Sequence, residues 1–560
     1  MSRLIVVYNY SASAQLREFG CLKRVSNGKV DVCYDDADVR VLKNDASGLR
    51  VAKGFLPGKA PENASVAINY DSQNEKLAVS RGILGSVPFY FYDDGKALFF
   101  STHIGIFAAL AGGITEVNSL DSYFTHKAVT APGTIYKNIY ALKPGETINK
   151  SGKEKAIREV YEDIKFKPDS GLKLKESAAA LKETLVLSVS SILSRNPETA
   201  VFLSGGLDSN ITASLAVKQG VKEVFSAKIN NDGFDESVLA KKAAKFYSMT
   251  YNEVPVGCFT YDDLFEIAQT YEQPFADASA YPIYKLMRAA SSKYKSFLTG
   301  DGADELFGGY LRYRAVKTAA AVPKIVKKPF KAFGSLFKTS AGERSLSGYI
   351  KKFSSAFSSS VCDVNASLYA CFSEEEKRAL FNDKSIVFKA LDEYKSFCSQ
   401  SPSLSAIFES DIKLQLADCF SLKIFYPAEK FGISVSSPFY DNEVVGFSQK
   451  VPEKFKTGFF GGKIILKEAF KNDVPDFAIK KRKRGFGIPL NLWFRTECKD
   501  LAYELLLSER ALSSGYFNKD FLTGLLDDHM SFRNNNGQKI WALCMFEMWK
   551  RTKRQLIVNR

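Results

Sequence analysis

Short runs of β-branched and aromatic residues alternate with turn residues through the first part of the chain. Asp71 and the tripeptide Asp93-Asp94-Gly95 are turn signals that bound such runs. The pattern predicts a β-rich domain with strands at residues 3–8, 66–70, 89–92 and 97–101. A charged stretch from Ser151 to Gly171, which includes Pro168, interrupts this pattern. We therefore predict a domain boundary there, between residues 1–165 and 166–560.

Helical and strand patterns alternate after that boundary. Leu181, Leu185, Val189 and Ile192 recur at the spacing of one helix face. Further helices are predicted around residues 211–216 and 235–247, and apolar strands at residues 200–203, 224–227, 251–256 and 297–299. Strands that alternate with helices are typical of a parallel, doubly wound sheet, so we expect an α/β domain. Beyond about residue 340 the pattern is mostly helical.

The composition is that of a globular protein and excludes several other classes. Of the 560 residues, 45% are hydrophobic and 25% are charged, which excludes a disordered, collagen-like or coiled-coil chain. Only three His are present (His103, His126 and His529), which argues against histidine-based catalysis or metal binding. The nine Cys form no CxxC pair, so we expect free thiols in a reducing compartment.

Charge and apolar segments bear on partners and location. The net charge of +15 could attract nucleic acid, an anionic membrane face or a phosphate-bearing substrate, or it could be a basic background without a partner. The start of the chain lacks the features of a signal peptide, and the longest apolar run, residues 104–114, is too short for a bilayer. We expect a soluble cytoplasmic protein without membrane insertion. Nucleic-acid binding is the weaker reading, and a homodimer stays open.

The first motif with chemical meaning is Ser204-Gly205-Gly206-Leu207-Asp208-Ser209. It lies between a predicted strand and a predicted helix, where backbone N–H groups and the helix N-terminus can bind an anion. The hydroxyls of Ser204 and Ser209 can donate hydrogen bonds, and Asp208 can hold Mg²⁺ bound to phosphate. The spacing is neither that of a Walker loop nor that of a dinucleotide-binding fingerprint. A phosphate loop of another type is therefore predicted.

The second motif runs from Thr299 to Tyr310 and reads TGDGADELFGGY. It follows a predicted strand, at the end of the sheet where open α/β folds bind ligands. Its acidic residues Asp301, Asp304 and Glu305 would repel one another beside a phosphate loop. Their presence predicts Mg²⁺ or another cationic partner.

A third motif, KKRKRGFGIP, covers residues 480–489. Its cationic run is closed by a Gly/Pro turn and can bring one Lys over a polyphosphate. Taken alone, such a run is more often a solvated face.

Together the three motifs resemble the synthetase domain of the asparagine synthetase family, whose phosphate loop reads SGGxDS. Pro438-Phe439-Tyr440-Asp441 and the segments at residues 272–277, 462–467 and 482–486 match it as well. The first 165 residues resemble the family's glutaminase domain at residues 83–90, 133–136 and 142–145. The resemblance implies a β-rich domain of the N-terminal nucleophile hydrolase type (α+β), followed by a doubly wound ATP-pyrophosphatase domain with a helical C-terminal part.

The resemblance also implies a nucleotide site. ATP and Mg²⁺ would bind over residues 204–209, with Ala227 against adenine and Leu203 lining the same pocket. Asp208 and Asp304 would coordinate the Mg²⁺. The residues that it assigns to the nucleotide are Leu203, Ser204, Gly205, Gly206, Leu207, Asp208, Ser209, Ala227, Thr299 and Gly300.

The reaction that the resemblance implies is amide formation through an acyl-adenylate. A carboxylate acceptor attacks the α-phosphorus of ATP and releases pyrophosphate, and ammonia or an amine donor then releases AMP. Lys483 would neutralise the charge that develops on the phosphates. Asp301 would accept the proton of the incoming nucleophile.

Two departures from the family concern nitrogen supply. The family's glutaminase uses a Cys directly after Met1, but this chain has Ser2 there, followed by Arg3. The family also has an Asp that binds the α-amino group of glutamine, whereas this chain reads Ser80-Arg81-Gly82. We expect an inactive glutaminase fold, with nitrogen from ammonia, an amine or a separate glutaminase.

The acceptor site departs from the family too. A Leu-Glu-Val-Arg-type element is replaced by Ile433-Ser434-Val435-Ser436, and an upstream Asp-Arg pair by Phe425-Tyr426. The acceptor could therefore be aspartate or another acid, for example on a sugar or natural product. Two alternatives remain: an intramolecular cyclase of the β-lactam or lasso-peptide synthetase type, and a nucleotide-binding regulator without catalysis.

Overall fold

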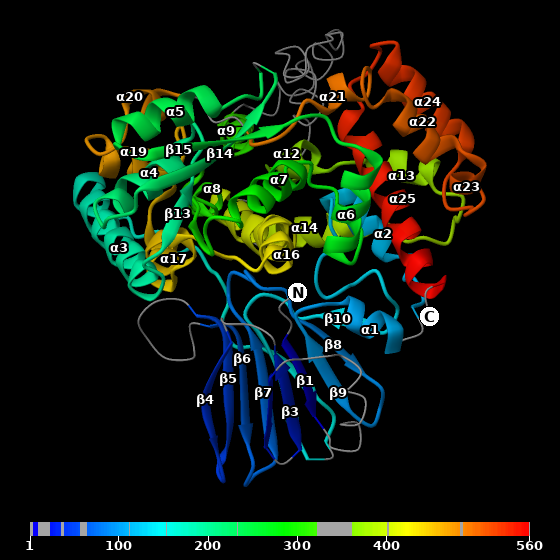
Figure 1. Cartoon of the computed structure of the whole chain (residues 1–560), viewed down its shortest axis with the longest axis horizontal. Coiled ribbons are helices and arrows are strands. Elements are labelled where there is room, and N and C mark those ends of the chain that lie inside the picture. Colours follow the sequence, from blue (N-terminus) through cyan, green and yellow to red (C-terminus); the bar gives the residue numbers. More distant parts are fainter. Residues whose placement is uncertain are drawn as a thin grey trace.

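The computed structural model describes most of the chain. The described residues are 4–8, 23–27, 29–34, 39–55, 64–110, 113–152, 154–231, 233–321, 361–399, 403–481 and 485–558. These segments form two antiparallel sheets in the N-terminal part, a parallel sheet in the middle of the chain, and helices around it (Figure 1).

The first two sheets each have six strands and pair only antiparallel. Strand β1 lies inside the first sheet, and all five of its residues are buried, as expected for a strand covered on both faces. In spatial order the first sheet is β10 (Ile139–Ala141), β8 (Tyr90–Asp93), β9 (Leu98–Ser101), β1 (Leu4–Tyr8), β3 (Val30–Tyr34) and β2 (Lys23–Asn27). The second is β12 (Ile157–Val160), β11 (Glu146–Ser151), β7 (Lys76–Arg81), β6 (Ala64–Asp71), β5 (Gly48–Phe55) and β4 (Val39–Asp45).

The third sheet has five parallel strands, which confirms the predicted α/β class. Alternate side chains point to opposite faces, as in any strand. Ala200 and Phe297 pack toward one helical layer, and Val201 and Leu298 pack toward the other. The spatial order is β15 (Thr250–Val256), β14 (Glu223–Ile229), β13 (Thr199–Phe202), β16 (Ser296–Leu298) and β17 (Ser434–Ser436).

Helices on both faces of the parallel sheet make it doubly wound. Helices α7 and α16 belong to the layer of Phe297, and α3 and α4 belong to the layer of Leu298. The predicted boundary at residue 165 lies between the end of β12 and the start of α3 and stays a prediction. The bounds are α3 (Leu174–Arg195), α4 (Leu207–Val217), α5 (Ser237–Phe246), α6 (Tyr261–Tyr271), α7 (Ala280–Ala290), α8 (Ala303–Phe307), α9 (Leu311–Ala321) and α16 (Ser421–Phe431).

The last part of the chain is helical, as predicted, with α25 (Gly537–Val558) as its long final helix (Figure 1). The other helices after residue 360 are α12 (Val361–Tyr369), α13 (Glu374–Leu380), α14 (Ala390–Ser399), α15 (Leu404–Ser410), the π-helix η4 (Asp411–Phe420), the 3₁₀ helix η5 (Pro438–Tyr440), α17 (Asn442–Lys450), α18 (Glu453–Lys456), α19 (Ile464–Phe470), α20 (Asp476–Lys480), α21 (Leu490–Trp493), α22 (Lys499–Leu507), α23 (Glu509–Leu512) and α24 (Lys519–Met530).

The antiparallel sheets share a hydrophobic core with the C-terminal helices. Buried residues of β1 and of α25 belong to one contiguous cluster. The N-terminal part also contains two short helices, α1 (Gly105–Leu110) and α2 (Ser119–His126) (Figure 1). The Tyr123 hydroxyl donates a hydrogen bond to the Ala542 carbonyl at 2.7 Å, so α2 is fixed to α25.

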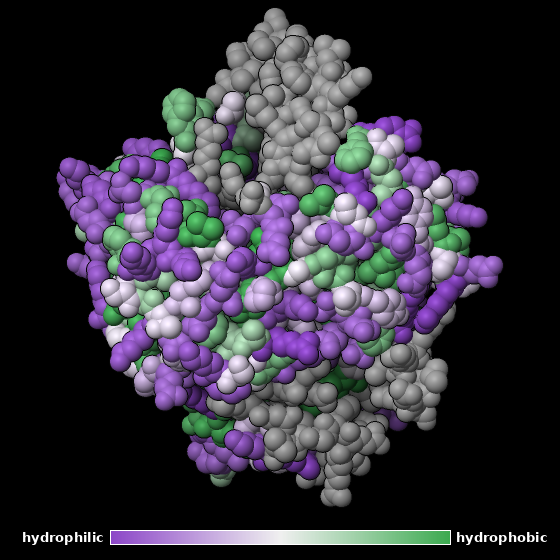
Figure 2. Space-filling view, turned by 45° about the horizontal axis from the view of Figure 1, so that its top comes forward, coloured by the Kyte–Doolittle hydropathy of each residue, from purple (hydrophilic) through white to green (hydrophobic). Residues whose placement is uncertain are grey.

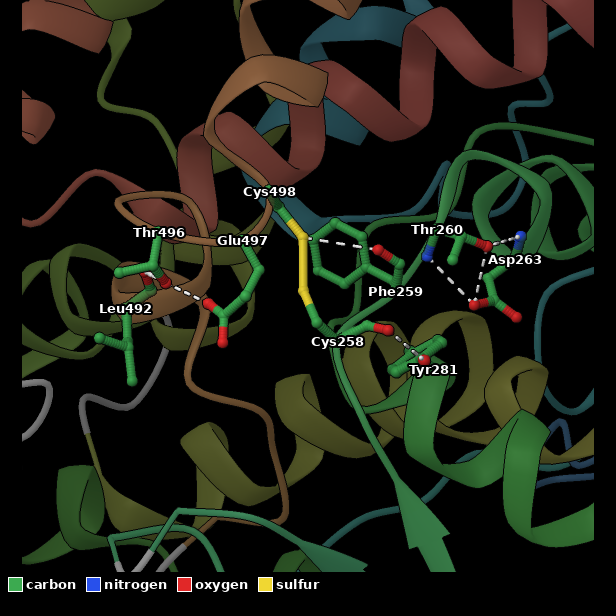
Figure 3. Close-up of a disulfide and its surroundings, with 9 residues drawn as sticks. All are labelled: Cys258, Phe259, Thr260, Asp263, Tyr281, Leu492, Thr496, Glu497 and Cys498. Carbon is green, nitrogen blue, oxygen red and sulfur yellow. Dashed lines mark hydrogen bonds between the residues drawn. A yellow bond between two sulfur atoms is a disulfide. The ribbon is translucent and has the colours of Figure 1, made fainter.

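A disulfide between Cys258 and Cys498 corrects the expectation that every thiol is free (Figure 3). Cys258 follows β15 and Cys498 precedes α22, so the bond joins the edge of the parallel sheet to the C-terminal helices. The two residues are 240 positions apart, a separation that no CxxC-type motif reveals. Free thiols are found at Cys419 and Cys544.

The face drawn in Figure 2 is mostly hydrophilic, with hydrophobic residues in small separate patches. Within the described part of the chain, no helix combines the length and the apolar character needed to cross a bilayer.

Candidate active site

The predicted phosphate loop is the turn between β13 and α4, and hydroxyl groups close it on itself. The backbone N–H of Ser204 donates to Ser209 Oγ at 3.1 Å, and the two hydroxyl oxygens lie 3.0 Å apart. The Gly206 N–H donates to Ser204 Oγ at 3.1 Å, and Gly206 is the N-cap of α4. The loop thus places hydroxyl groups beside the first backbone amides of α4. Both kinds of donor can hydrogen-bond to an anion.

The second motif begins at the end of β16, which pairs in parallel with β13. The two carboxyl ends therefore lie side by side. A Cβ atom at Gly300 would come within 2.7 Å of the Asp208 Cβ, so only glycine permits this approach. The hydroxyl of Thr212 on α4 donates to the Thr299 carbonyl at 3.2 Å and ties the two segments together.

Lys463 lies between the two carboxylates that were predicted to bind metal. Its Nζ is 2.5 Å from Asp208 Oδ1 and 2.5 Å from Asp304 Oδ1. The three side chains are nearly buried, and Gly309 packs so tightly that a Cβ there would overlap the Asp304 carboxylate. The acidic motif at residues 299–310 predicted Mg²⁺ or another cationic partner. The ammonium group of Lys463 is a cationic partner of this kind.

The donor set also fits Mg²⁺. Mg²⁺ prefers oxygen ligands, and it commonly binds one or two carboxylates together with substrate phosphates. Asp208 and Asp304 meet this requirement at the mouth of the phosphate loop, around a position that already holds a positive charge. Among the described residues, no group of three or more His, Cys, Asp and Glu side chains could hold a metal by itself. Phosphate oxygens would have to complete the coordination.

A cavity of about 280 Å³, here called the first cavity, opens at these strand ends. Its apolar wall includes Ile283, Met287 and Phe486, beside the predicted Leu203 and Ala227. The predicted residues that line it are Leu203, Ser204, Gly206, Asp208, Ser209, Ala227, Thr299, Gly300, Asp301 and Asp304.

The remaining predicted residues lie elsewhere. Gly205 packs against Leu239 and the Lys481 side chain, and Leu207 is buried in the hydrophobic core under α4. Lys483 and Ser2 fall outside the described residues.

The buried Glu305 and the partly buried Tyr310 form a hydrogen-bonded pair on the wall of the first cavity. The Tyr310 hydroxyl donates a hydrogen bond to Glu305 Oε1. Burial, with a further contribution from Asp304, raises the pKa of the Glu305 carboxyl to about 7. Asp301 lies near this pair, and its backbone carbonyl accepts a hydrogen bond from Ser437 Oγ at 2.6 Å.

Two cationic side chains of the first cavity, Lys127 and Lys423, were not identified from the sequence. Burial disfavours the charged form of Lys423, but Asp277 and Asp301 outweigh that effect and raise its pKa. Burial likewise works to raise the pKa of Asp277, but Lys423, Lys127 and hydrogen bonds from Ser279 together lower it. This end of the first cavity therefore carries stable opposite charges.

Of Lys127, Lys423 and Asp277, only Asp277 lies in a segment that the sequence analysis identified. It ends the segment 272–277, which matched the family pattern. Lys127 is the left-handed C-cap residue of α2, and no motif surrounds it. Lys463 stood in a matching segment but without an assigned role.

Comparisons with known proteins find two family domains in this chain. Residues 180–551 match the family Asparagine synthase, and residues 64–162 match the Glutamine amidotransferase domain. The glutamine-hydrolyzing asparagine synthetase 1 of Bacillus subtilis is 24% identical over 496 residues, 86% of this chain and 76% of the relative. A putative asparagine synthetase of Mycobacterium tuberculosis is 23% identical over 455 residues, 79% of this chain and 68% of the relative.

A relative with a different name matches a shorter part. Amidase chry2 of Gibberella zeae is 25% identical over 267 residues, 44% of this chain and 40% of the relative. The Asparagine synthase match covers more than half of the chain and contains both the phosphate loop and the acidic motif. The chain therefore belongs to the asparagine synthetase family and is an ATP-dependent carbon–nitrogen ligase.

Proposed function

We propose that the protein activates a substrate carboxylate as an acyl-adenylate and passes the acyl group to a nitrogen nucleophile. The products are an amide, AMP and pyrophosphate. The observation that carries this proposal is one cavity lined by the phosphate loop, by the Asp208 and Asp304 carboxylates and by Asp301.

The roles of the loop residues follow from their positions. Ser204, Ser209 and the first amides of α4 hold the phosphates that leave as pyrophosphate. Asp208 and Asp304 would hold Mg²⁺, which would offset the charge of the phosphates. Leu203 and Ala227 contact the adenine. Lys483 lies outside the described residues, and we assign it the stabilisation of charge on the transferred phosphate.

The acceptor lies at the end of the first cavity that carries Lys127, Lys423 and Asp277. Lys127 and Lys423 attract its carboxylate toward the α-phosphate, and Asp277 offers a place for a positively charged group on the acceptor. A zwitterionic acid such as aspartate fits this arrangement. The relatives support it, because the Bacillus protein is named an asparagine synthetase and the Mycobacterium protein a putative one.

Nitrogen comes from ammonia, an amine or a separate glutaminase rather than from the N-terminal domain. Gly82 stands where the family has an Asp for glutamine. The neighbouring Arg81 is fully engaged with carbonyl groups and Asp418, so it does not take over that contact. The missing charge-assisted hydrogen bond would be worth about 1.5–3 kcal/mol. We expect the purified protein to release no glutamate from glutamine, and steady release would contradict this part of the proposal.

The test of the adenylation step is exchange of labelled pyrophosphate into ATP with a panel of carboxylic acids that includes aspartate. Exchange needs the acceptor but no nitrogen donor. We expect exchange with at least one acid, and equal amounts of AMP and pyrophosphate once a donor is added. ADP and phosphate as products would rule out the adenylate.

Three variants assign the exchange to this site. Asp208→Asn removes a Mg²⁺ ligand and should lower exchange by about a hundredfold or more. Lys483→Met should lower it on the same scale. The matched control is Asp476→Asn on α20, whose exposed carboxylate pairs with Lys480 on that helix. Full exchange in Asp208→Asn would disprove the assignment.

A further inference from the structure

An ion pair between Lys481 and Glu236 lies beside the phosphate loop. The Lys481 Nζ is 2.5 Å from Glu236 Oε1. Glu236 precedes α5 and lines the first cavity, and Lys481 follows α20. Only 17% of the Lys481 side chain and 14% of the Glu236 side chain are exposed, so water screens this pair less than it screens a surface ion pair.

The ammonium group of Lys481 lies against the backbone of the phosphate loop. A Cβ atom at Gly205 would be 2.9 Å from Lys481 Nζ and 2.7 Å from Leu239 Cβ. Gly205 directly precedes Gly206, the N-cap residue of α4, where the amides that we assign to the phosphates begin. Lysine carries its charge on a flexible four-carbon stem, so the Lys481 ammonium can turn from Glu236 to an anion held at this turn.

The packing of α20 fixes the backbone of Lys481 at this place. Ala478 of α20 is buried in the same hydrophobic core as Ile211 of α4 and Ala240 of α5 (Figure 1). Lys481 is the C-cap residue of α20, and its N–H donates to the Phe477 carbonyl at 2.8 Å. The helix that starts at the phosphate loop and the helix that ends at Lys481 therefore share one core.

The carboxylates at the phosphate end of the first cavity oppose the binding of a polyanion. Asp208 and Asp304 share the ammonium group of Lys463, and Glu236 adds a third carboxylate to the wall. Pyrophosphate carries several negative charges, and like charges at close range disfavour each other. Lys481 neutralises Glu236, and its ammonium group offers three hydrogen-bond donors. It is therefore suited to bind pyrophosphate oxygens.

We propose that Lys481 binds the pyrophosphate product and that Glu236 is a positioning residue that promotes its release. The proposal rests on the proposed function, in which pyrophosphate leaves from the phosphate loop. While pyrophosphate is bound, the Lys481 ammonium donates hydrogen bonds to its oxygens. When pyrophosphate leaves, the ammonium group returns to Glu236, so departure of the anion does not leave the cation unpaired. Glu236 thus competes with pyrophosphate for Lys481 and weakens the retention of the product.

The test measures binding of inorganic pyrophosphate to the full chain in MgCl₂, without ATP, by isothermal titration calorimetry. We expect the native chain to bind it. Lys481→Met should bind it about tenfold more weakly or worse, the scale of one lost hydrogen bond to a charged group. Lys481→Arg should restore most of the affinity, because it keeps a positive charge and N–H donors. No binding by the native chain, or equal binding by Lys481→Met, would overturn the proposal.

The variant Glu236→Gln separates a positioning role from a purely structural one. It removes the carboxylate that competes for Lys481, so pyrophosphate should bind about threefold more tightly, the scale of a partly exposed charge interaction. Damage to the fold would weaken binding instead, and weaker binding in Glu236→Gln would refute its role.

The matched control is another lysine–glutamate pair, Lys293 with Glu223. Glu223 is the first residue of β14, whereas Ser226 and Ala227, further along that strand, line the first cavity. Lys293→Met and Glu223→Gln should bind pyrophosphate as the native chain does. A loss in Lys293→Met as large as that in Lys481→Met would refute the assignment.

Exchange kinetics separate this inference from the proposed function. In the exchange of labelled pyrophosphate into ATP, Lys481→Met should raise the KM for pyrophosphate about tenfold and leave the KM for the carboxylic acid unchanged. An equal rise in both KM values would indicate general damage and refute the assignment. If the native chain shows no exchange with any acid, the proposed function fails, and the pyrophosphate affinities still decide the role of Lys481. If exchange occurs and Lys481→Met leaves the KM for pyrophosphate unchanged, the inference fails and the proposed function stands.

Discussion

Lys463 compensates two carboxylates that would otherwise repel each other. Asp208 and Asp304 both contact its ammonium group, and all three side chains are shielded from water. Lys463 also has a positive φ of 56°, a backbone conformation that most side chains avoid. A residue held in such a conformation beside functional groups is typical of an active site. Lys463 occupies the position that we assign to Mg²⁺, so the two cations should compete.

The variant Lys463→Met tests this competition. Without divalent ions it removes the ammonium group that contacts both buried carboxylates and should destabilise the fold by about 3 kcal/mol. Mg²⁺ can then bind without displacing an ammonium, so it should raise the Tm of the variant more than that of the native chain. The measurement is thermal unfolding in EDTA and in MgCl₂. Lys471→Met, on an exposed pair after α19, is the control, and an equal Mg²⁺ shift in all three chains would contradict the prediction.

Sequence alone predicted the residues of contiguous motifs and missed those that tertiary packing brings in. The phosphate loop and the acidic motif contain their own chemistry, so Asp208, Asp301 and Asp304 were identified. Lys127 and Lys423 come from α2 and α16, far apart in sequence. Nothing in their local sequence states which carboxylates they meet, because that depends on the packing of the two helices.

At the scale of elements, the predictable strands are those with apolar runs. Strands β13, β14, β15 and β16 were predicted from buried β-branched and aromatic residues. Strand β17 was not, because Ser434-Val435-Ser436 is short and polar and owes its conformation to pairing with β16. Strand β17, at the edge of the parallel sheet, thus had the weakest sequence signal of its five strands.

Helix α18 contains a buried lysine that costs stability. Lys456 is fully buried, and its Nζ has no hydrogen-bond partner among the described residues. The Nζ lies 3.8 Å from the centre of the Phe166 ring. Burial lowers the pKa of Lys456 far below its usual 10.5, and Glu453 offsets only part of this. The unfolded chain therefore binds a proton that the folded chain does not, and stability rises with pH up to about 10.5.

Lys456→Met should stabilise the protein at neutral pH. The apolar side chain fills a similar volume without the need to release a proton, and the gain should be about 1–4 kcal/mol. The gain should shrink as the pH approaches 10, because the unfolded native chain then also loses its proton. Chemical denaturation at pH 7 and pH 9.5 measures both values. Lys454→Met on the same helix is the control, and a gain that does not fall with pH would argue against a neutral Lys456.

At the scale of the molecule, a buried ion pair between Arg81 and Asp418 links the N-terminal sheets to the helices around the parallel sheet. Arg81 lies at the end of β7, and its Nη1 is 3.0 Å from Asp418 Oδ1 in η4. Its guanidinium also donates to the carbonyls of Val87, Leu142, Gly85 and Ala417. Asp418 Oδ2 in turn accepts the Ala131 N–H at 2.8 Å. Both side chains are buried, so each depends on the other for compensation.

This arrangement predicts that the two parts unfold together and that Arg81 and Asp418 are energetically coupled. Arg81→Gln leaves a buried carboxylate without its cation and should cost about 3–5 kcal/mol. Burial already raises the pKa of Asp418 and Arg81 opposes this, so without Arg81 the carboxyl should take up a proton more readily. The loss in Arg81→Gln should therefore be smaller at pH 5 than at pH 8.

A double-mutant cycle with Asp418→Asn measures the coupling by chemical denaturation. The combined variant should lose about 1–3 kcal/mol less than the sum of the single variants, since neither leaves the other's charge unpaired. Arg158→Gln is the matched control, because Arg158 pairs with Glu146 inside the N-terminal part and is about one-third exposed. That variant should cost less than about 1 kcal/mol. Additive losses for Arg81 and Asp418, or two separate unfolding transitions in the native chain, would show that the pair does not join the parts into one cooperative unit.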